Sequence, residues 1–265
     1  MPELPEVEAV CRKLRKEAVG GIIAEASVLR ARTIYPQDAE QLSKVERHTI
    51  ESVERRGKNI ILHLSGGYAL RIHLRMTGNL LVIPDARLQS AKVRVSFRFR
   101  DGRGLVFEDT RALGRVNLYE EKELDELLGD IGIEPLSKAF TVAKLVEMAS
   151  QSRKPSKLFL MDQQHIAGIG NMYAAEALFR ARINPKQPMN GIGKKKIEAL
   201  HSAILAILKE AVKVAVQSYK QPGSYKEMDF AVYGRKGEPC AVCKRKIARI
   251  VQGDRSTYYC PHCQR

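Results

Sequence analysis

The first six residues, Met1-Pro2-Glu3-Leu4-Pro5-Glu6, carry groups that could do chemistry. If Met1 is removed, as a small second residue usually allows, Pro2 becomes the amino terminus with a secondary amine. An α-amino group titrates near ~7.7–8, so part of it is unprotonated at neutral pH and can attack an aldehyde carbon to form an iminium. Glu3 and Glu6 lie within reach for acid or base work. The segment is also an ordinary helix start, because Pro5 precedes a periodic apolar pattern.

The carboxyl-terminal segment contains a candidate metal site. Four of the five cysteines lie in the last 26 residues, as two Cys-x-x-Cys pairs that 16 residues separate. This spacing is typical of a tetrahedral thiolate site for zinc, and the zinc would be structural because sulfur would fill all four positions. A pair of redox dithiols is the alternative. The candidate ligands are Cys240, Cys243, Cys260 and Cys263.

The residues between the two cysteine pairs predict a hairpin. Segments 246–251 and 255–259 have the pattern of two strands about the turn Gly253-Asp254. Arg255 and the run Lys244-Arg245-Lys246 make this hairpin basic, as a ribbon that contacts nucleic acid would be. A solvated charged surface would have the same sequence character.

A glycine-containing turn, Gly168-Ile169-Gly170, precedes the helical pattern that opens at Asn171. Its glycines would let a ligand approach the backbone, and the amino end of the helix would offer N–H groups to a phosphate. The dinucleotide-binding fingerprint does not apply, because the sequence has no strand pattern before the turn. Two helices flanking such a turn suit a clamp on the DNA backbone better.

Three short segments with basic residues lie where predicted strands end or begin. Their sequences are Arg-Arg-Gly-Lys at 55–58, His-Leu-Arg-Met at 73–76 and Asp-Thr-Arg at 109–111. Each could be solvated surface by itself, so these segments gain meaning only together with the other motifs.

The composition indicates a basic globular protein with more than one domain. The 265 residues carry a formal net charge of +15, with basic residues along the whole chain. Folded basic surfaces of this kind most often bind nucleic acid by neutralising phosphates, and a ribosome-like or simply soluble basic protein is the alternative. No run approaches the ~18 apolar residues of a membrane span, and the amino terminus lacks an apolar signal region. We therefore expect a cytosolic protein.

Hydrophobic periodicity divides the chain into three parts. After Pro5 the apolar positions follow helical spacing as far as Gly20-Gly21, and from about residue 22 to 120 the period is two. Short strands with turns between them predict a β-sandwich or barrel, and helical patterns follow at 138–150, 171–182 and 194–217. The expected fold class is α+β and multidomain, with domains at 1–130, 131–225 and 226–265. The predicted strands are 22–29, 48–53, 59–64, 68–74, 80–83, 93–99, 105–107 and 116–119.

Taken in order, the motifs resemble the formamidopyrimidine-DNA glycosylase / endonuclease VIII family. They read MPELPEVE, RRGKN, HLRMTGNL, EDTRALGR, DQQHIAGIGNMYAAEALFRARI, VYGRKGEPC and YYCPHCQR, and they cover nearly the entire chain. The variant Glu-Leu-Pro-Glu-Val is similar to the formamidopyrimidine branch. The resemblance implies an N-terminal helix plus β-sandwich, a helix–two-turn–helix domain and a zinc-ribbon β-hairpin, with damaged double-stranded DNA bound between the lobes. It also implies a monomer in the bacterial cytoplasm, associated with the nucleoid.

The resemblance further implies a base-excision-repair DNA glycosylase with AP lyase activity. Pro2 would attack the sugar C1′, and Glu3 would be the acid that assists ring opening and β,δ-elimination. Glu6 would support the site, and Lys58 would bind the phosphate and help the δ-elimination. The implied DNA-binding residues are Asn171 and Arg255 for flanking phosphates, Met76, Arg111 and Leu113 for the gap left by a flipped nucleotide, Lys157 near the damaged base, and His73 and Gly170.

Two positions depart from the family pattern. Relatives that act on 8-oxoguanine commonly have an aromatic wedge at the position of Leu113. They also have a longer, glycine-rich loop where this chain has only residues 217–228, and that loop is expected to cover an everted 8-oxoguanine. We therefore predict weak 8-oxoguanine excision, with activity on abasic sites and on formamidopyrimidines or oxidised pyrimidines.

Two other functions would explain part of the sequence. A non-excising protein that binds damaged DNA or abasic sites could keep the same scaffold. A zinc-ribbon transcription or ribosome-associated factor would explain the charge and the cysteines. It would not explain the Pro2-Glu3 terminus together with the matching internal motifs.

Overall fold

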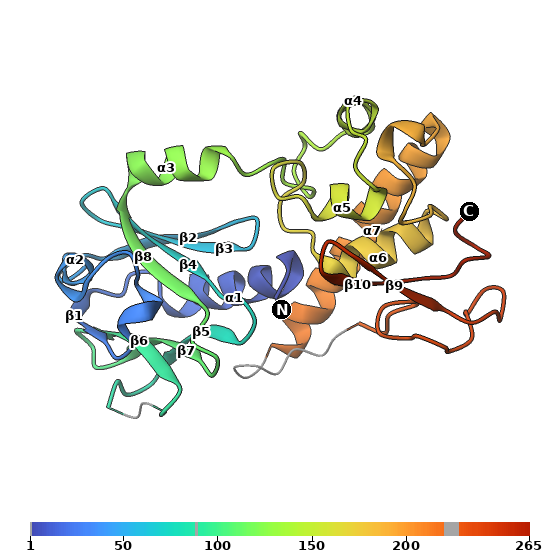
Figure 1. Cartoon of the computed structure of the whole chain (residues 1–265). Helices are drawn as coiled ribbons and strands as arrows, with labels where there is room; N and C mark the ends of the chain where they lie inside the picture. The colour runs from blue at the N-terminus through green and yellow to red at the C-terminus, as the bar shows by residue number, and fades with distance from the viewer. Residues whose placement is uncertain (1, 88–89, 220–227) are drawn as a thin grey trace. The chain divides into compact units, whose positions relative to one another are not determined.

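The structure is a computed structural model that describes residues 2–87, 90–219 and 228–265 (Figure 1). The chain forms two compact units. The first comprises Met1–Asp130 and Val214–Lys226, and the second comprises Ile131–Lys213 and Glu227–Arg265, so helix α7 (Lys194–Ser218) contributes to both. Within the described ranges, no helix has the length and apolar character needed to cross a membrane.

The first unit is built on two four-stranded sheets in which all pairs are antiparallel. The strand order is β1-β6-β7-β5 in one sheet and β2-β3-β4-β8 in the other. The predicted combination of a helix and a β-sandwich is confirmed, and each strand lies within a few residues of its predicted place. The bounds are β1 Ile23–Val28, β2 Ile50–Arg56, β3 Asn59–Leu64, β4 Tyr68–His73, β5 Gly78–Ile83, β6 Val93–Phe99, β7 Gly104–Asp109 and β8 Arg115–Glu120.

Strand β6 shows why alternation predicted this part of the chain. Its odd-numbered positions from Val93 to Phe99 are apolar and at most 2% exposed. The even-numbered positions carry polar residues, and Arg98 is exposed. Ser96 is only 4% exposed, however, so the second face of the strand is partly covered.

Helix α1 (Leu4–Glu17) packs its apolar stripe into the core of the same unit, in contact with β2, β3 and β5. Val7, Val10 and Cys11 are 0% exposed. Burial raises the pKa of the Cys11 thiol to about 12, so this cysteine is an inert core residue. After the helix, Gly20 adopts a positive φ of 84°, a conformation that favours glycine and ends the helical path.

Three short elements of the first unit were not predicted. They are η1 (Ala31–Thr33), α2 (Ala39–Ser43) and α3 (Glu121–Gly129). Helix α2 buries only Leu42 and helix α3 only Leu124. One buried residue does not make a periodic apolar stripe, and that is why the pattern gave no indication of these helices.

The second unit is mainly helical. Helix α6 is the most deeply placed element, because every residue from Met172 to Phe179 is buried, and it contacts α5 and β10. Helix α4 begins at Val142, later than predicted, because the Thr141 side chain accepts the Lys144 N–H at 3.1 Å and caps the helix there. The helices are α4 Val142–Ser150, α5 Ser156–Met161, α6 Asn171–Arg180, η2 Met189–Gly191 and the larger part of α7.

The predicted hairpin is formed by β9 (Ala248–Gln252) and β10 (Arg255–Tyr259). Its two turn residues, Gly253 and Asp254, both have positive φ (52° and 58°), which is the geometry of a tight two-residue hairpin turn. The hairpin end of the chain shares a small core with α6, so it packs as part of the helical unit. That core contains Ala175, Phe179, Val232, Cys240, Ile247 and Cys260.

Candidate active site and metal centre

The amino end of α1 brings the two predicted catalytic carboxylates together. Glu3 is the N-cap residue, and Pro5 lies in the first turn. The backbone N–H of Glu3 donates to Oε2 of Glu6 at 2.7 Å, as in a capping box. Glu3 is 1% exposed and Glu6 is 7% exposed, whereas Pro2 is half-buried. The segment is therefore an ordinary helix start and also an ordered acidic site beside Pro2.

The docking of α1 on β2 places the β2–β3 turn at this end of the helix. Three hydrogen bonds between α1 and β2 show that the helix and the strand run in opposite directions. In order they are Arg55 Nε to Glu8 Oε2 at 3.1 Å, Cys11 Sγ to the Glu54 carbonyl at 3.5 Å, and Arg15 Nε to the Val53 carbonyl at 2.8 Å. Gly57 (φ 59°) and Lys58 form the turn that follows β2, so they lie toward the amino end of α1. Lys58 is 9% exposed, so a largely buried cation lies near the start of α1.

His73 ends β4 and pairs with Asn59 of β3. Burial, together with the positive charges of Arg75, Arg71 and Lys58, lowers the pKa of His73 to about 4. Nδ1 of the ring accepts the backbone N–H of Arg75 at 3.0 Å. The ring is therefore neutral at pH 7 with its proton on Nε2, so His73 can donate a hydrogen bond but cannot supply a charge.

The predicted gap-filling residues lie on two loops of the first unit. Met76 belongs to the connection between β4 and β5, and Arg111 and Leu113 belong to the connection between β7 and β8. Arg111 Nη1 lies 3.1 Å from Met76 Sδ, and both residues are exposed, Met76 at 43%. Leu113 is half-buried two residues further along. The fold thus brings Met76 and Arg111 into contact across 35 positions of sequence.

In the second unit, the glycine turn is held from within by Gln163. The Gln163 amide accepts the N–H of Gly168 at 2.9 Å and donates to the carbonyl of Ile169 at 2.8 Å. Gly168 has a positive φ of 81°, which favours glycine, and Gly170 is the N-cap of α6. Asn171 begins α6, and its Oδ1 atom is buried with no hydrogen-bond partner within the described parts of the chain. The turn therefore presents an ordered helix start, as the sequence predicted.

Lys157 lies in α5 and is 0% exposed. Its Nζ donates to the Ser256 carbonyl at 3.0 Å and to Oγ1 of Thr257 at 2.6 Å, so it fastens α5 to strand β10 of the hairpin. Arg255 immediately precedes these partners and is exposed. These two hydrogen bonds join Lys157 to the hairpin, and its contact with a damaged base stays a prediction.

The four predicted metal ligands converge on one point. Their Sγ atoms all lie within 4.8 Å of one another, with Cys243–Cys260 at 3.4 Å and Cys240–Cys263 at 3.9 Å. A tetrahedral zinc ion with Zn–S bonds of ~2.3 Å needs sulfur atoms about 3.8 Å apart, so the cluster fits one zinc ion. Sulfur fills all four positions, and the ion is therefore structural. Two separate redox dithiols would not require a common centre.

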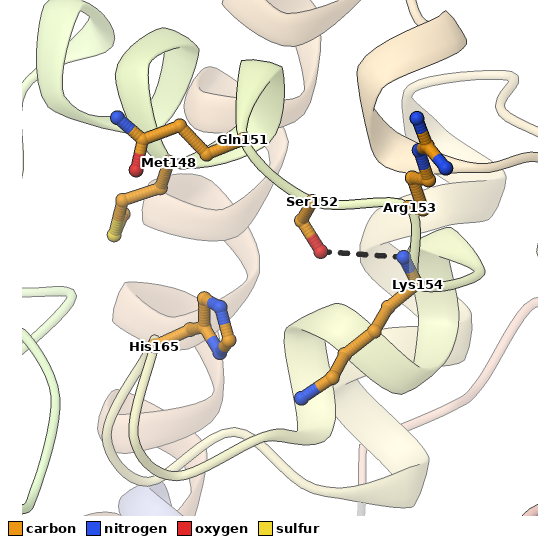
Figure 2. A pocket seen from close by; sticks show the side chains of 6 residues that line it. All are labelled: Met148, Gln151, Ser152, Arg153, Lys154 and His165. Atoms are coloured by element: carbon orange, nitrogen blue, oxygen red, sulfur yellow. Dashed lines mark hydrogen bonds between the residues drawn. The ribbon is translucent and has the colours of Figure 1, made fainter.

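The helical unit also contains a hollow of about 560 Å³ beside the end of α4 (Figure 2). Lys154 Nζ pairs with Asp162 Oδ2 next to it, and His165 Nδ1 lies 3.1 Å from the same oxygen. Burial would raise the pKa of Asp162, but the hydrogen bond from Lys154 and other donors lower it overall. No residue that the sequence predicted for the site lines this hollow. Its lining is Met148, Gln151, Ser152, Arg153, Lys154 and His165.

Two buried acids that hold loops in place were not among the predicted site residues. Glu176 is 2% exposed, and its carboxylate accepts the backbone N–H groups of three consecutive residues, Ala231, Val232 and Tyr233, at 2.8–2.9 Å. Asp109 is 0% exposed and accepts N–H groups from the loop that follows it. An acid inside an apolar helix is a sequence signal that could have identified Glu176. Asp109 looks like any polar residue at the end of a strand.

Three domain profiles match consecutive parts of the chain. The formamidopyrimidine-DNA glycosylase N-terminal domain matches residues 1–116, the H2TH domain of the same glycosylase matches residues 131–222, and a zinc finger found in FPG and IleRS matches residues 237–265. Together with the sandwich, the helical unit and the four-cysteine centre, they define a bifunctional DNA glycosylase and AP lyase with one structural zinc ion.

Known proteins match this chain over its whole length. It is 41% identical over 272 residues to the formamidopyrimidine-DNA glycosylase of Chloroflexus aggregans, covering 100% of this chain and 98% of the relative. It is 38% identical over 276 residues to that of Geobacillus kaustophilus, covering 100% of both. The chain belongs to the formamidopyrimidine-DNA glycosylase family.

Solved structures of relatives agree with this assignment. The fold is similar to Lactococcus lactis Fpg (MutM) in a complex with DNA containing N7-benzyl-Fapy-dG, with a TM-score of 0.91, 33% identity and 99% of each chain covered. It is equally similar to MutM in a complex with DNA containing carbocyclic 8-oxo-G, with a TM-score of 0.91, 34% identity and 99% of each chain covered. The predictions of fold, zinc, damaged-DNA binding and glycosylase/lyase activity are confirmed.

Proposed function

We propose that this enzyme excises ring-opened or oxidised bases with the amine of Pro2 as nucleophile. The observation that supports this most directly is the start of α1, where buried Glu3 and Glu6 lie beside Pro2 and the β2–β3 turn supplies Lys58. The amine attacks C1′ of the sugar, and the base departs with the electron pair of the glycosidic bond. The amine then loses its proton, and Glu3 protonates the ring oxygen, so that the sugar opens to an iminium.

The iminium makes strand cleavage possible without attack of water on the backbone. It acidifies the C2′ proton, and removal of that proton expels the 3′ phosphate by β-elimination. A second elimination expels the 5′ phosphate, and Lys58 stabilises the departing phosphate in this step. Glu6 keeps the site ordered through its bond to the Glu3 N–H at 2.7 Å. Hydrolysis of the iminium returns the free amine.

Both compact units supply groups that suit DNA phosphates. In the first unit these are Lys58 and the neutral His73, which can donate from Nε2. In the second unit the N–H groups at the start of α6 form an anion site, and the exposed Arg255 adds a charge. The net charge of +15 supports a large phosphate contribution to affinity. The second-unit residues proposed to bind DNA are Lys157, through the hairpin that it anchors, with Gly170, Asn171 and Arg255.

The two loops of the first unit supply the residues that replace a flipped nucleotide. Eversion of a base costs a few kcal/mol, and an apolar wedge offsets part of that cost by filling the gap. Met76 is proposed to be that wedge, with Leu113 beside it. Arg111 donates to the orphaned partner base, as its guanidinium can do toward guanine or cytosine edges.

We propose formamidopyrimidines and abasic sites as the preferred substrates and slow excision of 8-oxoguanine. Relatives have been captured with N7-benzyl-Fapy-dG DNA and with abasic DNA, and a further relative with carbocyclic 8-oxo-G DNA. Leu113 lacks the aromatic ring expected of an 8-oxoguanine enzyme. The short loop at 217–228 lies largely outside the described residues. The alignments with two relatives run over 272 and 276 positions, so this chain of 265 residues is shorter than these relatives in one or more segments.

Borohydride trapping tests the proposed nucleophile. With Met1 shown by mass spectrometry to be removed, the enzyme should form a covalent adduct with a duplex that contains an abasic site. Pro2→Gly should lose most of this adduct while keeping its affinity for the duplex. An undiminished adduct from Pro2→Gly would defeat the assignment, and strong binding with no adduct from the processed wild-type protein would identify a non-excising damage binder.

A panel of lesions in one duplex context tests the substrate range. Formamidopyrimidine, an oxidised pyrimidine, 8-oxoguanine opposite cytosine and an abasic site are compared for base excision and strand nicking. We expect 8-oxoguanine to be excised far more slowly than the abasic site is cleaved. Equal rates for these two substrates would refute the proposed preference.

We further propose a monomer that acts in the bacterial cytoplasm at the nucleoid. The bacterial sources of the relatives and the basic charge of the chain support this placement. The division into domains at 1–130, 131–225 and 226–265 is likewise our proposal for the functional parts of the chain.

A further inference from the structure

Two loops connect the sheets of the sandwich at one end. Residues 74–77 lead from β4 to β5, and residues 110–114 lead from β7 to β8. Because β4 pairs with β8 in one sheet and β5 pairs with β7 in the other, the two loops run side by side. Met76 is on the first loop, and Arg111 and Leu113 are on the second. The relative position of the loops therefore sets the spacing of these three side chains.

Asp109, the last residue of β7, holds both loops from beneath. Its side chain is 0% exposed. Oδ2 accepts the N–H groups of Leu113 and Gly114, each at 2.7 Å. Oδ1 accepts the N–H of Arg111 at 3.1 Å and also the hydroxyl of Thr77. One carboxylate thus ties three residues of the second loop to one residue of the first.

The hydrogen-bond pattern requires both side-chain oxygens of residue 109 to be acceptors. All four partners donate to Asp109, and a carboxylate accepts on both oxygens whereas an amide accepts on one. With asparagine, the amide oxygen could serve the Leu113 and Gly114 N–H groups, but its NH2 would then face the N–H of Arg111. That N–H would depend on Thr77 Oγ1 alone, which lies 3.1 Å away. Asparagine therefore loosens the link between the loops without removing volume.

Packing around the loops leaves little room for another arrangement. Gly78 and Gly114 both pack on the buried ring of Phe107, and a Cβ atom at either glycine would lie 2.8 or 2.4 Å from its Cζ. Arg75 and Ala112 adopt positive φ angles of 54° and 50°, a region that non-glycine residues rarely occupy. Such backbone is kept only where surrounding contacts hold it. The His73 ring accepts the Arg75 N–H, and the Asp109 carboxylate accepts the N–H groups of Arg111 and Leu113 on either side of Ala112.

We propose that Asp109 is a positioning residue for base eversion. It holds Met76 and Arg111 at the spacing needed to occupy the gap of a flipped nucleotide, so the inference rests on the proposed function of these loops. The 3.1 Å contact between Arg111 Nη1 and Met76 Sδ exists in the protein alone. Preformed loops avoid the cost of ordering at the moment when the base leaves the stack. An abasic site in single-stranded DNA has neither a base nor a partner, so its cleavage does not need this arrangement.

Thr77 offers a matched pair of variants. Thr77→Val removes the hydroxyl at nearly constant shape, whereas Thr77→Ser keeps it, and Asp109→Asn tests the carboxylate. Single-turnover excision of formamidopyrimidine from a duplex is compared with cleavage of an abasic site in single-stranded DNA. Fluorescence of 2-aminopurine beside the lesion reports eversion directly. Loss of one buried hydrogen bond predicts about tenfold slower duplex excision and eversion in Asp109→Asn and Thr77→Val. Thr77→Ser and all single-stranded cleavage should stay near wild type.

Met76→Ala separates failure of this inference from failure of the proposed function. If Met76→Ala slows duplex excision but Asp109→Asn and Thr77→Val do not, the loops act as proposed and the positioning role is wrong. If Met76→Ala has no effect on duplex excision, the proposed gap-filling function of the loops is wrong, and the positioning role that rests on it is refuted with it. Equal losses on single-stranded abasic DNA and on duplex DNA in both loop variants would indicate a general folding defect and overturn the proposal.

Discussion

Replacing the fully buried Lys157 by methionine distinguishes two roles for this lysine: attachment of the hairpin to α5 and contact with the damaged base. Its Nζ donates to the Ser256 carbonyl at 3.0 Å and to Thr257 Oγ1 at 2.6 Å, and Lys157 and Thr257 are both 0% exposed. Methionine keeps the apolar stem but leaves the carbonyl without this donor. A hydrogen bond from a charged donor contributes about 1.5–3 kcal/mol. We expect the attachment of the hairpin to α5 to lose about 3 kcal/mol, roughly a hundredfold in its opening equilibrium.

The assay compares binding with the integrity of the hairpin. Fluorescence anisotropy at fixed salt measures the affinity for duplexes that contain formamidopyrimidine, an abasic analogue or no damage. Release of zinc to a chelator reports opening of the hairpin. Because Arg255 is on this hairpin, Lys157→Met should weaken binding to all three duplexes by a similar factor and speed zinc release. Thr257→Val should show part of the same effect, and Thr257→Ser, which keeps the hydroxyl, should not.

One result would refute this reasoning. If Lys157→Met releases zinc at the wild-type rate and binds the abasic duplex normally, but loses affinity or excision only where a damaged base is present, Lys157 acts on the base. Its contacts with Ser256 and Thr257 would then be incidental to its function.

Two further predictions concern the metal and pH. Chelation of zinc should abolish DNA binding before the sandwich unfolds, because the hairpin depends on its metal and packs in the other compact unit. Circular dichroism for unfolding and anisotropy for DNA binding, followed in one chelator titration, show which is lost first. The pKa of His73 is lowered from 6.5 to about 4, so folding favours the neutral ring. The contribution of His73 to the free energy of unfolding is therefore complete above pH 6.5 and is lost as the pH falls through 4. His73→Asn keeps an acceptor for the Arg75 N–H and should reduce the loss of stability at acid pH, measured by urea unfolding, by about 3 kcal/mol. An unchanged acid loss would contradict the assignment.

Elements with a regular buried face could be predicted from the sequence. The alternation in β6 and the apolar stripes of α1 and α7 gave their types and nearly their limits. Short helices with one buried residue, such as α2 and α3, could not be predicted, because a single contact has no period. The zinc ligands were predictable because two Cys-x-x-Cys pairs are sufficient to fill a tetrahedral site.

The sequence by itself determined which groups are available: the Pro2-Glu3 terminus, the basic charge, the glycine turn and the four thiolates. The tertiary structure alone decided where buried polar side chains point. Lys157 donates to residues about 100 positions away, and Thr77 meets Asp109 across 32 positions. Periodicity records only which side chains are removed from water. Hydrogen-bond partners that are distant in sequence are set by the pairing of strands and by the docking of α5 against the hairpin, and no local pattern encodes either.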